Sequence, residues 1–326
     1  MARNSLIFLS VAIAPLLALI PKSAHAFCRT TTVAIPTTYA PDQKGCWSEG
    51  VPLFWRNQCV GYSLQKAAGE NIPYPVASDV MDAAFNRWAV VPCPQASADG
   101  HVSVSIRPFD NGPVACTKVE YNANASNQHV IVFRDAKWPH PGDQYNTLAL
   151  TTVTFNTITG EIYDADMEVN TADQPITADG KVLPDGYDLE SIITHEAGHF
   201  YGLAHSENLR ATMYPQYQHG TTLMRSLSHD DVEGICAIYP PNGKRNVGTS
   251  VDKSGQIDAT SCDPTPRHGF STLCKDEQPS RKKSFLPCSA AARSPGRSVS
   301  SVAMVIASAS MAAVAAMRRQ RRRYAE

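Results

Sequence analysis

Residues 195–206 read HEAGHFYGLAHS, a stretch with three histidines and one glutamate at fixed intervals. Residues four apart in an α-helix lie on the same face, about one turn from each other. A helix through this stretch therefore directs the imidazoles of His195 and His199 toward one ion. Glu196 lies about 100° around the helix from His195, so we expect its carboxylate to reach a water beside the ion and act as general base.

A third ligand requires the chain to change direction after the helix. Gly202 permits this, because glycine accepts the left-handed conformation that ends a helix, and His205 can then return to the ion. Three imidazoles occupy three positions of a tetrahedral zinc and leave the fourth for water, as in a catalytic site. The alternative is a surface helix that carries histidines without a metal. The full spacing favours the zinc site.

The surrounding segments predict a mixture of strands and helices. Apolar residues recur at helical spacing in 76–88, whereas 101–108 alternates as a strand does. Residues 147–170 predict two strands joined near Thr159-Gly160 as a hairpin. Further strands are expected in 53–65 and 129–135. The strands and helices in this order indicate an α+β fold.

Two helix starts are visible in the second half of the chain. Asp188 is a suitable N-cap for the helix that carries His195. Ser228 and Asp231 resemble a capping box at the start of a last helix.

Both ends of the chain have targeting features. Residues 1–26 combine Arg3, an apolar run and an Ala24-His25-Ala26 cleavage pattern, so they predict a secretory signal peptide. Residues 298–317 carry no charge and precede an arginine cluster, which predicts one membrane span with its C-terminus inside. An uncleaved N-terminal anchor and a soluble alanine-rich C-terminal helix are the alternatives.

These features divide the chain into five parts: a signal peptide (1–26), a short lead (27–45), a globular domain with the predicted zinc site (46–240), a Pro/Ser/Gly-rich linker (241–297) and the C-terminal span with its arginine cluster (298–326). Residues 45–240 contain 10 Lys/Arg and 23 Asp/Glu. This excess of negative charge disfavours nucleic acid as a partner. We expect a monomer with membrane attachment through the tail.

Nine cysteines predict disulfides and an oxidising compartment. If Cys288 belongs to the tail, the remaining eight allow 105 pairings. Proximity in the sequence favours Cys46 with Cys59 and Cys93 with Cys116, and Cys262 with Cys274 could close one small loop.

The quoted stretch resembles the zinc signature of the metzincins, HExxHxxGxxH. Ser206 after the third histidine, and Met213-Tyr214-Pro215-Gln216-Tyr217, are similar to the matrixin branch, and Asp230-Asp231 resembles the start of its last helix. The resemblance covers roughly 46–240. It implies that residues 46–240 are a zinc peptidase domain, an endopeptidase that acts on protein or peptide substrates. It also implies a twisted mixed sheet above the cleft and three main helices. It also implies that Met213 lies beneath the zinc and that Pro215–Tyr217 line a substrate pocket.

Several departures from this family affect the prediction. A Pro-Arg-Cys-Gly switch is absent; Cys28 could cap the zinc before activation, although a disulfide is the better interpretation. The hairpin lacks the histidines of the family's structural zinc. Its acidic residues Asp164, Asp166 and Glu168 could bind calcium or form an ordinary solvated strand face.

The C-terminal tail resembles bacterial sorting tails of the MYXO-CTERM type, which implies bacterial-type export and attachment at the cell surface. The leading hypothesis is therefore a secreted or surface-tethered zinc endopeptidase. The alternatives are a catalytically silent binding module on the same scaffold and a zinc hydrolase of non-peptide amides. Glu196 distinguishes an enzyme from the silent module, because only catalysis requires it.

Overall fold

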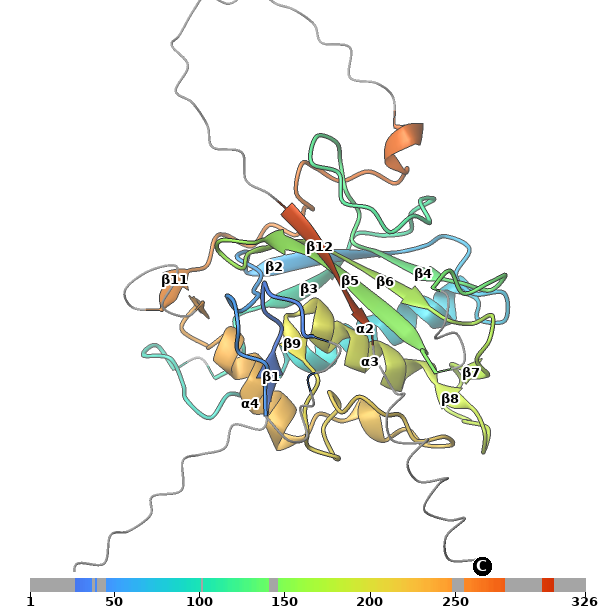
Figure 1. The fold of residues 1–326 in the computed structure, drawn as a ribbon, viewed down its shortest axis with the longest axis horizontal. Coiled ribbons are helices and arrows are strands. Elements are labelled where there is room, and N and C mark those ends of the chain that lie inside the picture. Colours follow the sequence, from blue (N-terminus) through green and yellow to red (C-terminus); the bar gives the residue numbers. More distant parts are fainter. Residues whose placement is uncertain are drawn as a thin grey trace, which may run out of the picture.

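The computed structural model describes residues 27–36, 39, 45–100, 102–140, 146–247 and 255–278, and the backbone of 301–307. The expected signal peptide, residues 1–26, lies outside the described residues, and so does the tail expected at 298–326 except for 301–307. One large sheet and three α-helices organise the described part (Figure 1).

A six-stranded sheet forms one layer, in the order β12-β5-β6-β4-β2-β3 (Figure 1). Its strands are β2 (Cys59–Leu64), β3 (Arg107–Asp110), β4 (Val130–Phe133), β5 (Ala149–Asn156), β6 (Ile162–Val169) and β12 (Ser301–Ala307). Strands β3, β2, β4 and β6 pair in parallel, whereas β5 pairs antiparallel with both of its neighbours. The predicted hairpin is confirmed: Gly160 takes a positive φ of 77° between β5 and β6.

Three helices accompany the sheet: α2 (Tyr74–Ala89), α3 (Leu189–Phe200) and α4 (His229–Ile238). The Asp188 side chain accepts a hydrogen bond from the Ser191 amide at 2.9 Å, which confirms it as the N-cap of α3. Ser228 and Asp231 form the capping box of α4 as predicted. The mixed sheet with three helices confirms the predicted α+β class.

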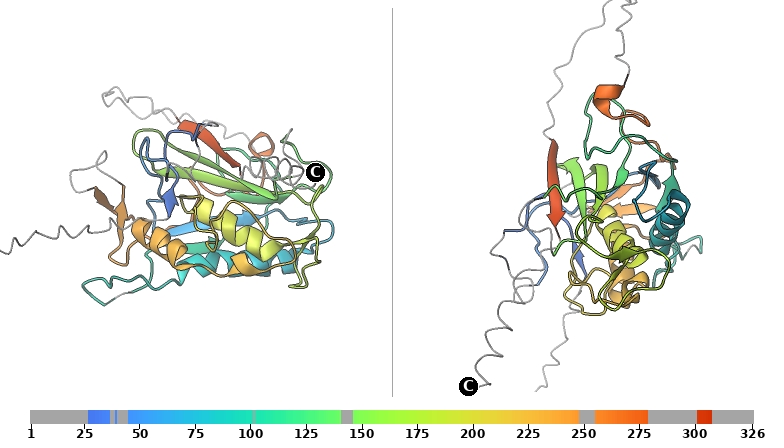
Figure 2. Two further views of the ribbon diagram at one scale, coloured as in Figure 1. Left: turned by 60° about the horizontal axis from the view of Figure 1, so that its bottom comes forward. Right: turned by 90° about the vertical axis from the view of Figure 1, so that its right-hand side faces the viewer.

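Helices α2 and α3 pack beside each other under the sheet (Figure 2). The helical stripe of α2 faces the core through Ala77, Val80, Met81, Ala84, Phe85 and Trp88. The Trp88 indole N–H donates to the Thr194 carbonyl at 2.8 Å, and the Phe85 ring meets the Phe200 ring edge-on. Burial of these aromatic side chains fixes α3, which carries the histidines, against the rest of the core.

Short elements complete the fold. Three two-stranded pairs join β1 (Cys28–Arg29) to β9 (Leu203–Ala204), β7 (Ile176–Thr177) to β8 (Tyr187–Asp188), and β10 (Lys244–Asn246) to β11 (Gln256–Asp258). Two 3₁₀ turns, η1 (Leu223–Arg225) and η2 (Lys275–Glu277), lie in loops. The β1–β9 pair fixes the chain directly after α3, where the third histidine follows.

The strand predicted in 101–108 begins later than expected. In the structure Ser103 makes only an isolated bridge to Pro92, and the regular strand β3 starts at Arg107. Val102 and Val104 bond to the backbone of Cys93 and Val91, directly after α2. The Ser105 amide donates to the Tyr239 carbonyl at 3.0 Å, so this segment bonds to the ends of two helices before it joins the sheet at Arg107.

Four disulfides link segments that are mostly far apart in the sequence: Cys28–Cys46, Cys59–Cys262, Cys93–Cys236 and Cys116–Cys274. The expectation that Cys28 forms a disulfide is confirmed. The pairs favoured by proximity, Cys46–Cys59, Cys93–Cys116 and Cys262–Cys274, are wrong. Closeness along the chain does not predict pairing here, because the sheet brings residues together that lie more than a hundred positions apart.

The chain after Pro240 packs onto the domain, where composition alone predicts a linker. Arg245 is fully buried, and its guanidinium donates to the carbonyls of Trp55 and Asn57, both at 2.7 Å. Two disulfides then attach residues 255–278 to the rest of the domain, one at Cys59 of β2 and one at Cys116 in the loop after β3. The domain therefore extends to at least Gln278, because its core and its cross-links include this segment.

The tail contributes one strand to the described structure. Seven residues of the predicted span, Ser301–Ala307, form β12 at the outer edge of the sheet. Among the described residues, no helix has the length and apolar character needed to cross a bilayer.

Candidate metal centre

Helix α3 brings His195, Glu196 and His199 to one buried site. All three side chains are at most 1% exposed. The imidazole rings of His195 and His199 lie with their centroids 4.9 Å apart, as the one-turn spacing requires.

His205 reaches the same site after a turn at Gly202. Gly202 has a φ of 98°, and its amide donates to the His199 carbonyl at 2.9 Å, so it ends the helix as expected. A Cβ at this position would also lie 2.9 Å from the Leu53 carbonyl oxygen. The three histidines offer ligand atoms that all lie within 4.8 Å of one another.

Hydrogen bonds to the backbone orient two of the rings. His195 Nδ1 lies 2.6 Å from the Thr212 carbonyl oxygen, and His199 Nδ1 lies 2.9 Å from that of Leu203. A carbonyl can only accept, so each Nδ1 carries the proton and each Nε2 keeps a free lone pair. This tautomer leaves Nε2 available to a metal.

The donor set fits zinc. His195 Nε2 is buried and lacks a hydrogen-bond partner among the described residues, while His199 Nε2 and His205 Nε2 lie 3.2 Å apart. Burial lowers the pKa of His195 to about 3 and that of His199 to about 4, and it holds the pKa of His205 well below its usual value. Neutral imidazoles that converge on one point are the ligands that zinc accepts.

Glu196 is held by a neighbour that the sequence does not single out. Its Oε2 accepts a hydrogen bond from the Thr151 hydroxyl at 2.6 Å. Burial raises the pKa of Glu196 to about 7, although the hydrogen bonds from Thr151 oppose the shift. A carboxyl group in this range can both take up and release a proton near neutral pH. Thr151 lies on β5, and only the paired sheet brings it to α3.

The Peptidase_M10 family, described as Matrixin, matches residues 54–240, which is more than half of the 326 residues. The chain belongs to the matrixin family. The mixed sheet with three helices is accordingly a metzincin fold.

This matrixin resembles curated relatives over short segments. It is 44% identical over 75 residues to stromelysin-1 of Rattus norvegicus, which is 22% of this chain and 16% of that protein. It is 41% identical over 75 residues to metalloendoproteinase 1 of Glycine max, covering 22% of this chain and 24% of the relative. It is 41% identical over 81 residues to neutrophil collagenase of Homo sapiens, covering 24% and 16%. The matched parts thus span a quarter or less of these relatives.

Met213 lies directly against helix α3 of this matrixin. A Cβ on Gly198 would lie only 2.2 Å from Met213 Sδ and 2.9 Å from the Trp88 ring. Glycine at position 198 therefore gives the methionine its place against α3, next to His199. Met213 is 2% exposed.

The turn around Met213 is held by one buried carboxylate. Asp231 accepts hydrogen bonds from the amides of Thr212, Met213 and Ser228 at 2.7–3.0 Å. The Thr212 carbonyl orients the His195 ring. Asp231, which holds the Thr212 and Met213 amides, therefore supports the position of His195 indirectly. The sequence pattern around Asp231 predicts only the start of a helix.

The predicted pocket residues lie in the segment that follows. Tyr217 has its ring centroid 5.4 Å from that of His195, and its hydroxyl lies 3.4 Å from the Ile192 carbonyl. Its ring packs against the small cluster of Leu148, Ala149 and Ile192. Pro215 is partly exposed, two residues after Met213. The structure thus places Tyr217 beside the histidines, on the side toward β5.

The three acidic residues on β6 have partners inside the protein. Glu168 pairs with Arg134 at 2.6 Å and with His140 at 2.7 Å. The two oxygens of Asp166 accept from the amides of Val130 and Glu120.

All three carboxylates on β6 are at most 3% exposed, so the solvated strand face expected as the alternative to calcium is wrong. They do not form one of the groups of possible metal ligands found among the described residues. The strand is buried on both faces, which an alternation of acidic and apolar residues does not indicate.

Asp164 should make the stability of this matrixin depend on pH. Its Oδ1 lacks a hydrogen-bond partner among the described residues and lies 3.7 Å from His129 Nε2. Burial, and next the Asp166 carboxylate, hold the pKa of Asp164 well above its usual value. Because the folded state keeps a proton that the unfolded state releases, its stabilising contribution is complete below about pH 3.9 and is lost as the pH rises through the folded pKa.

The melting temperature of the Asp164→Asn variant should therefore fall less between pH 5 and pH 8 than the melting temperature of the unaltered protein. Thermal unfolding followed by circular dichroism at both pH values checks this. Asp79→Asn, at an exposed position on α2, serves as the control. Parallel pH profiles for Asp164→Asn and the unaltered protein would contradict the assignment.

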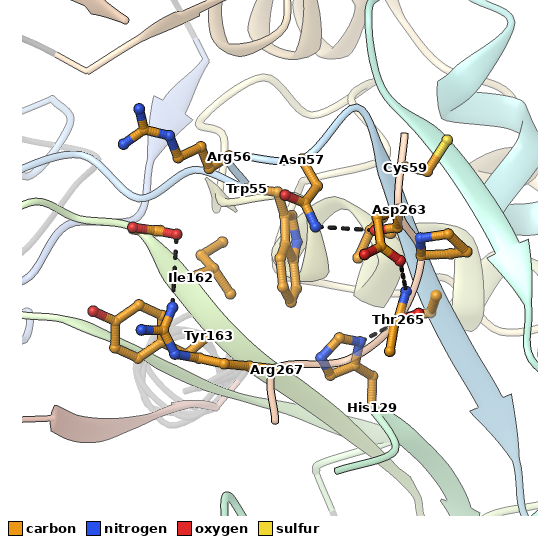
Figure 3. A pocket seen from close by; sticks show the side chains of 14 residues that line it. Trp55, Arg56, Asn57, Cys59, His129, Ile162, Tyr163, Asp263, Thr265 and Arg267 are labelled. Atoms are coloured by element: carbon orange, nitrogen blue, oxygen red, sulfur yellow. Dashed lines mark hydrogen bonds and ion pairs between the residues drawn. The ribbon is translucent and has the colours of Figure 1, made fainter. Parts of the chain in front are cut away.

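A cavity of about 130 Å³ lies next to His129, away from the metal centre (Figure 3). Figure 3 shows Trp55 and Arg267 among its lining side chains. The Arg267 guanidinium lies 3.9 Å above the Tyr163 ring and pairs with Glu161 at 3.9 Å. The cavity lining does not include His195, His199 or His205. The cavity is therefore separate from the candidate metal centre.

Proposed function

We propose that this protein is a secreted or surface-tethered zinc-dependent endopeptidase with Glu196 as general base. The observation that carries the proposal is the buried cluster itself: three neutral histidines converge, and the Glu196 carboxyl group lies on the helix that carries two of them. Four disulfides support an oxidising location outside the cytoplasm. A signal peptide in residues 1–26 and bacterial-type export remain part of the proposal.

His195, His199 and His205 would hold the zinc through their Nε2 atoms. A zinc ion supplies Lewis acidity, which activates a water molecule and polarises a peptide carbonyl. Glu196 accepts the proton of the attacking water and passes it to the leaving nitrogen, a transfer that suits a pKa near 7. Thr151 holds the carboxyl group in place through its 2.6 Å hydrogen bond.

The surroundings of the site suggest how a substrate binds. Strand β5 contributes Thr151, and an extended peptide that pairs with the edge of this strand would bring its carbonyl close to Glu196. Pro215 and Tyr217 would line the pocket for the side chain after the scissile bond. Calcium is no part of this proposal, because Asp166 and Glu168 already bond to protein groups.

Zinc content and cleavage together test the function. We expect one zinc per chain, and mass spectra of a digested peptide library should show pairs of fragments whose summed mass equals that of the parent peptide plus one water. A chelator should stop cleavage, and added zinc should restore it. One zinc per chain without cleavage, also after removal of the C-terminal segment 298–326, would favour the silent binding module. Hydrolysis of small amides without peptide cleavage would favour the other alternative.

A further inference from the structure

Strand β12 covers the edge of the sheet that borders the metal centre. It pairs antiparallel with β5 over seven residue pairs, from Ser301 opposite Asn156 to Ala307 opposite Leu150. Figure 2 shows β12 along the outer edge of the sheet, and the strand order places it beyond β5. Without β12, β5 would be an open edge strand with unpaired backbone groups.

The strand at this edge, β5, carries the residue that contacts Glu196. Thr151 donates its hydroxyl hydrogen to Glu196 Oε2, and Ile306 is the residue opposite Thr151 in β12. The other edge of the sheet is β3, separated from β5 by three strands. A segment on β5 therefore occupies the edge on which a peptide substrate would pair.

The backbone of β5 fixes which residues of β12 form the ladder. The Asn156 amide donates to the Glu161 carbonyl, and the Leu148 carbonyl accepts from the Asn170 amide, each at 2.8 Å. Both contacts lie on the β6 side. The N–H and C=O of one residue in an antiparallel strand point to the same side, and successive residues alternate.

It follows that the even positions from 148 to 156 turn their backbone groups toward β6, while Thr151, Val153 and Phe155 turn theirs toward β12. Their partners are Ile306, Met304 and Val302. The intervening positions of β12, such as Val305, turn their amides away from β5.

We propose that the C-terminal segment 301–307 is an intramolecular inhibitor that occupies the substrate edge of β5 and keeps the peptidase latent. This inference rests on the proposed function, because it assigns a regulator to that same site. Covalent attachment gives the segment a high effective concentration at the edge, so modest strand pairing is sufficient to exclude a free peptide. The same residues cannot cross a bilayer and pair with β5 at once, so attachment of the tail to a membrane, or its removal, would release the site.

Two proline variants of the chain from Phe27 to Glu326 test the proposal. Proline has no N–H, and at the edge of a sheet it is tolerated only where that N–H would face away from the ladder. Met304→Pro should remove a ladder bond and raise kcat/KM for a fluorogenic peptide by about tenfold or more, because the open fraction of the enzyme rises. Val305→Pro, one residue away and with similar loss of chain freedom, should stay within about twofold of the unaltered protein.

A synthetic peptide of residues 298–309 should inhibit the Met304→Pro variant competitively, and the same peptide with proline at position 304 should not. Equal kcat/KM in all three proteins, with cleavage that depends on Glu196, would overturn the proposal and leave the proposed function intact.

Hydrogen exchange gives a second readout that needs no activity. In the Glu196→Gln background, the amides of Thr151, Val153 and Phe155 should exchange faster with Met304→Pro than with Val305→Pro. Equal exchange would overturn the proposal whether or not the protein cleaves peptides. Faster exchange without cleavage by any active-background form would reject the peptidase function and the inhibitory role while retaining the strand pairing.

Discussion

Glu196→Gln is expected to lower kcat for peptide hydrolysis about a thousandfold and to leave one zinc bound per chain. Glutamine keeps the size of the side chain and can still accept the Thr151 hydrogen bond, but it cannot take up a proton. The three histidines keep their backbone partners, so the metal affinity should change little. Steady-state kinetics on a fluorogenic peptide and metal analysis of the same preparation measure the two effects separately.

Glu190→Gln is the matched control for this variant. Glu190 lies in the first turn of the same helix, where its carboxylate pairs with Arg87 and Arg225 at the surface side of α3. It should retain nearly full activity. Should Glu196→Gln cleave peptides as fast as Glu190→Gln, Glu196 would not be the general base, whatever the zinc content.

Asp231→Asn is expected to destabilise the fold by about 3 kcal/mol, since buried hydrogen bonds to a charged group contribute about 1.5–3 kcal/mol each. One Asp231 oxygen accepts from the amides of Thr212 and Ser228, and the other accepts from the Met213 amide. An asparagine NH₂ cannot accept, so at least one buried amide loses its partner. For a domain of this size the melting temperature should fall by roughly 6–12 °C.

The same substitution should weaken zinc binding, because the Thr212 carbonyl holds the His195 ring. Asp230→Asn is the control. Asp230 Oδ2 accepts a hydrogen bond from the Ser206 hydroxyl, and this hydroxyl can rotate to bond with an asparagine side chain instead. Competition with a zinc-binding dye should show a lower affinity for Asp231→Asn than for Asp230→Asn. Equal melting temperatures for the two variants would show that Asp231 does not support the Met213 turn.

Local signals in the sequence predicted the elements on which the site is built. The helix cap at Asp188, the capping box at Ser228 and the hairpin around Gly160 are all confirmed, because each depends on residues within a few positions of one another. The course of the histidine stretch belongs to this class as well. Its helix spacing and its terminating Gly202 set the direction of the three imidazoles, and the β1–β9 pair and the Thr212 carbonyl then hold them.

Contacts between segments that lie far apart in the sequence could not be predicted from such local patterns. The disulfide partners, the burial of Arg245 beyond the expected domain boundary and the partners of the β6 carboxylates each depend on which strands become neighbours. Proximity along the chain therefore favoured wrong cysteine pairs. Composition could not show that a segment rich in Gly and Pro packs on the sheet.

The sequence by itself determined which side chains meet at the metal centre: the spacing of His195 and His199, the adjacent Glu196 and the turn that returns His205 are set by short-range backbone geometry. Only the tertiary structure decided what holds and covers that centre. Thr151 reaches Glu196, Asp231 supports the turn at Met213, and β12 lies on the edge of β5 because the sheet and helices are packed together. Such contacts follow from burial of a shared core, which no local pattern of residues encodes.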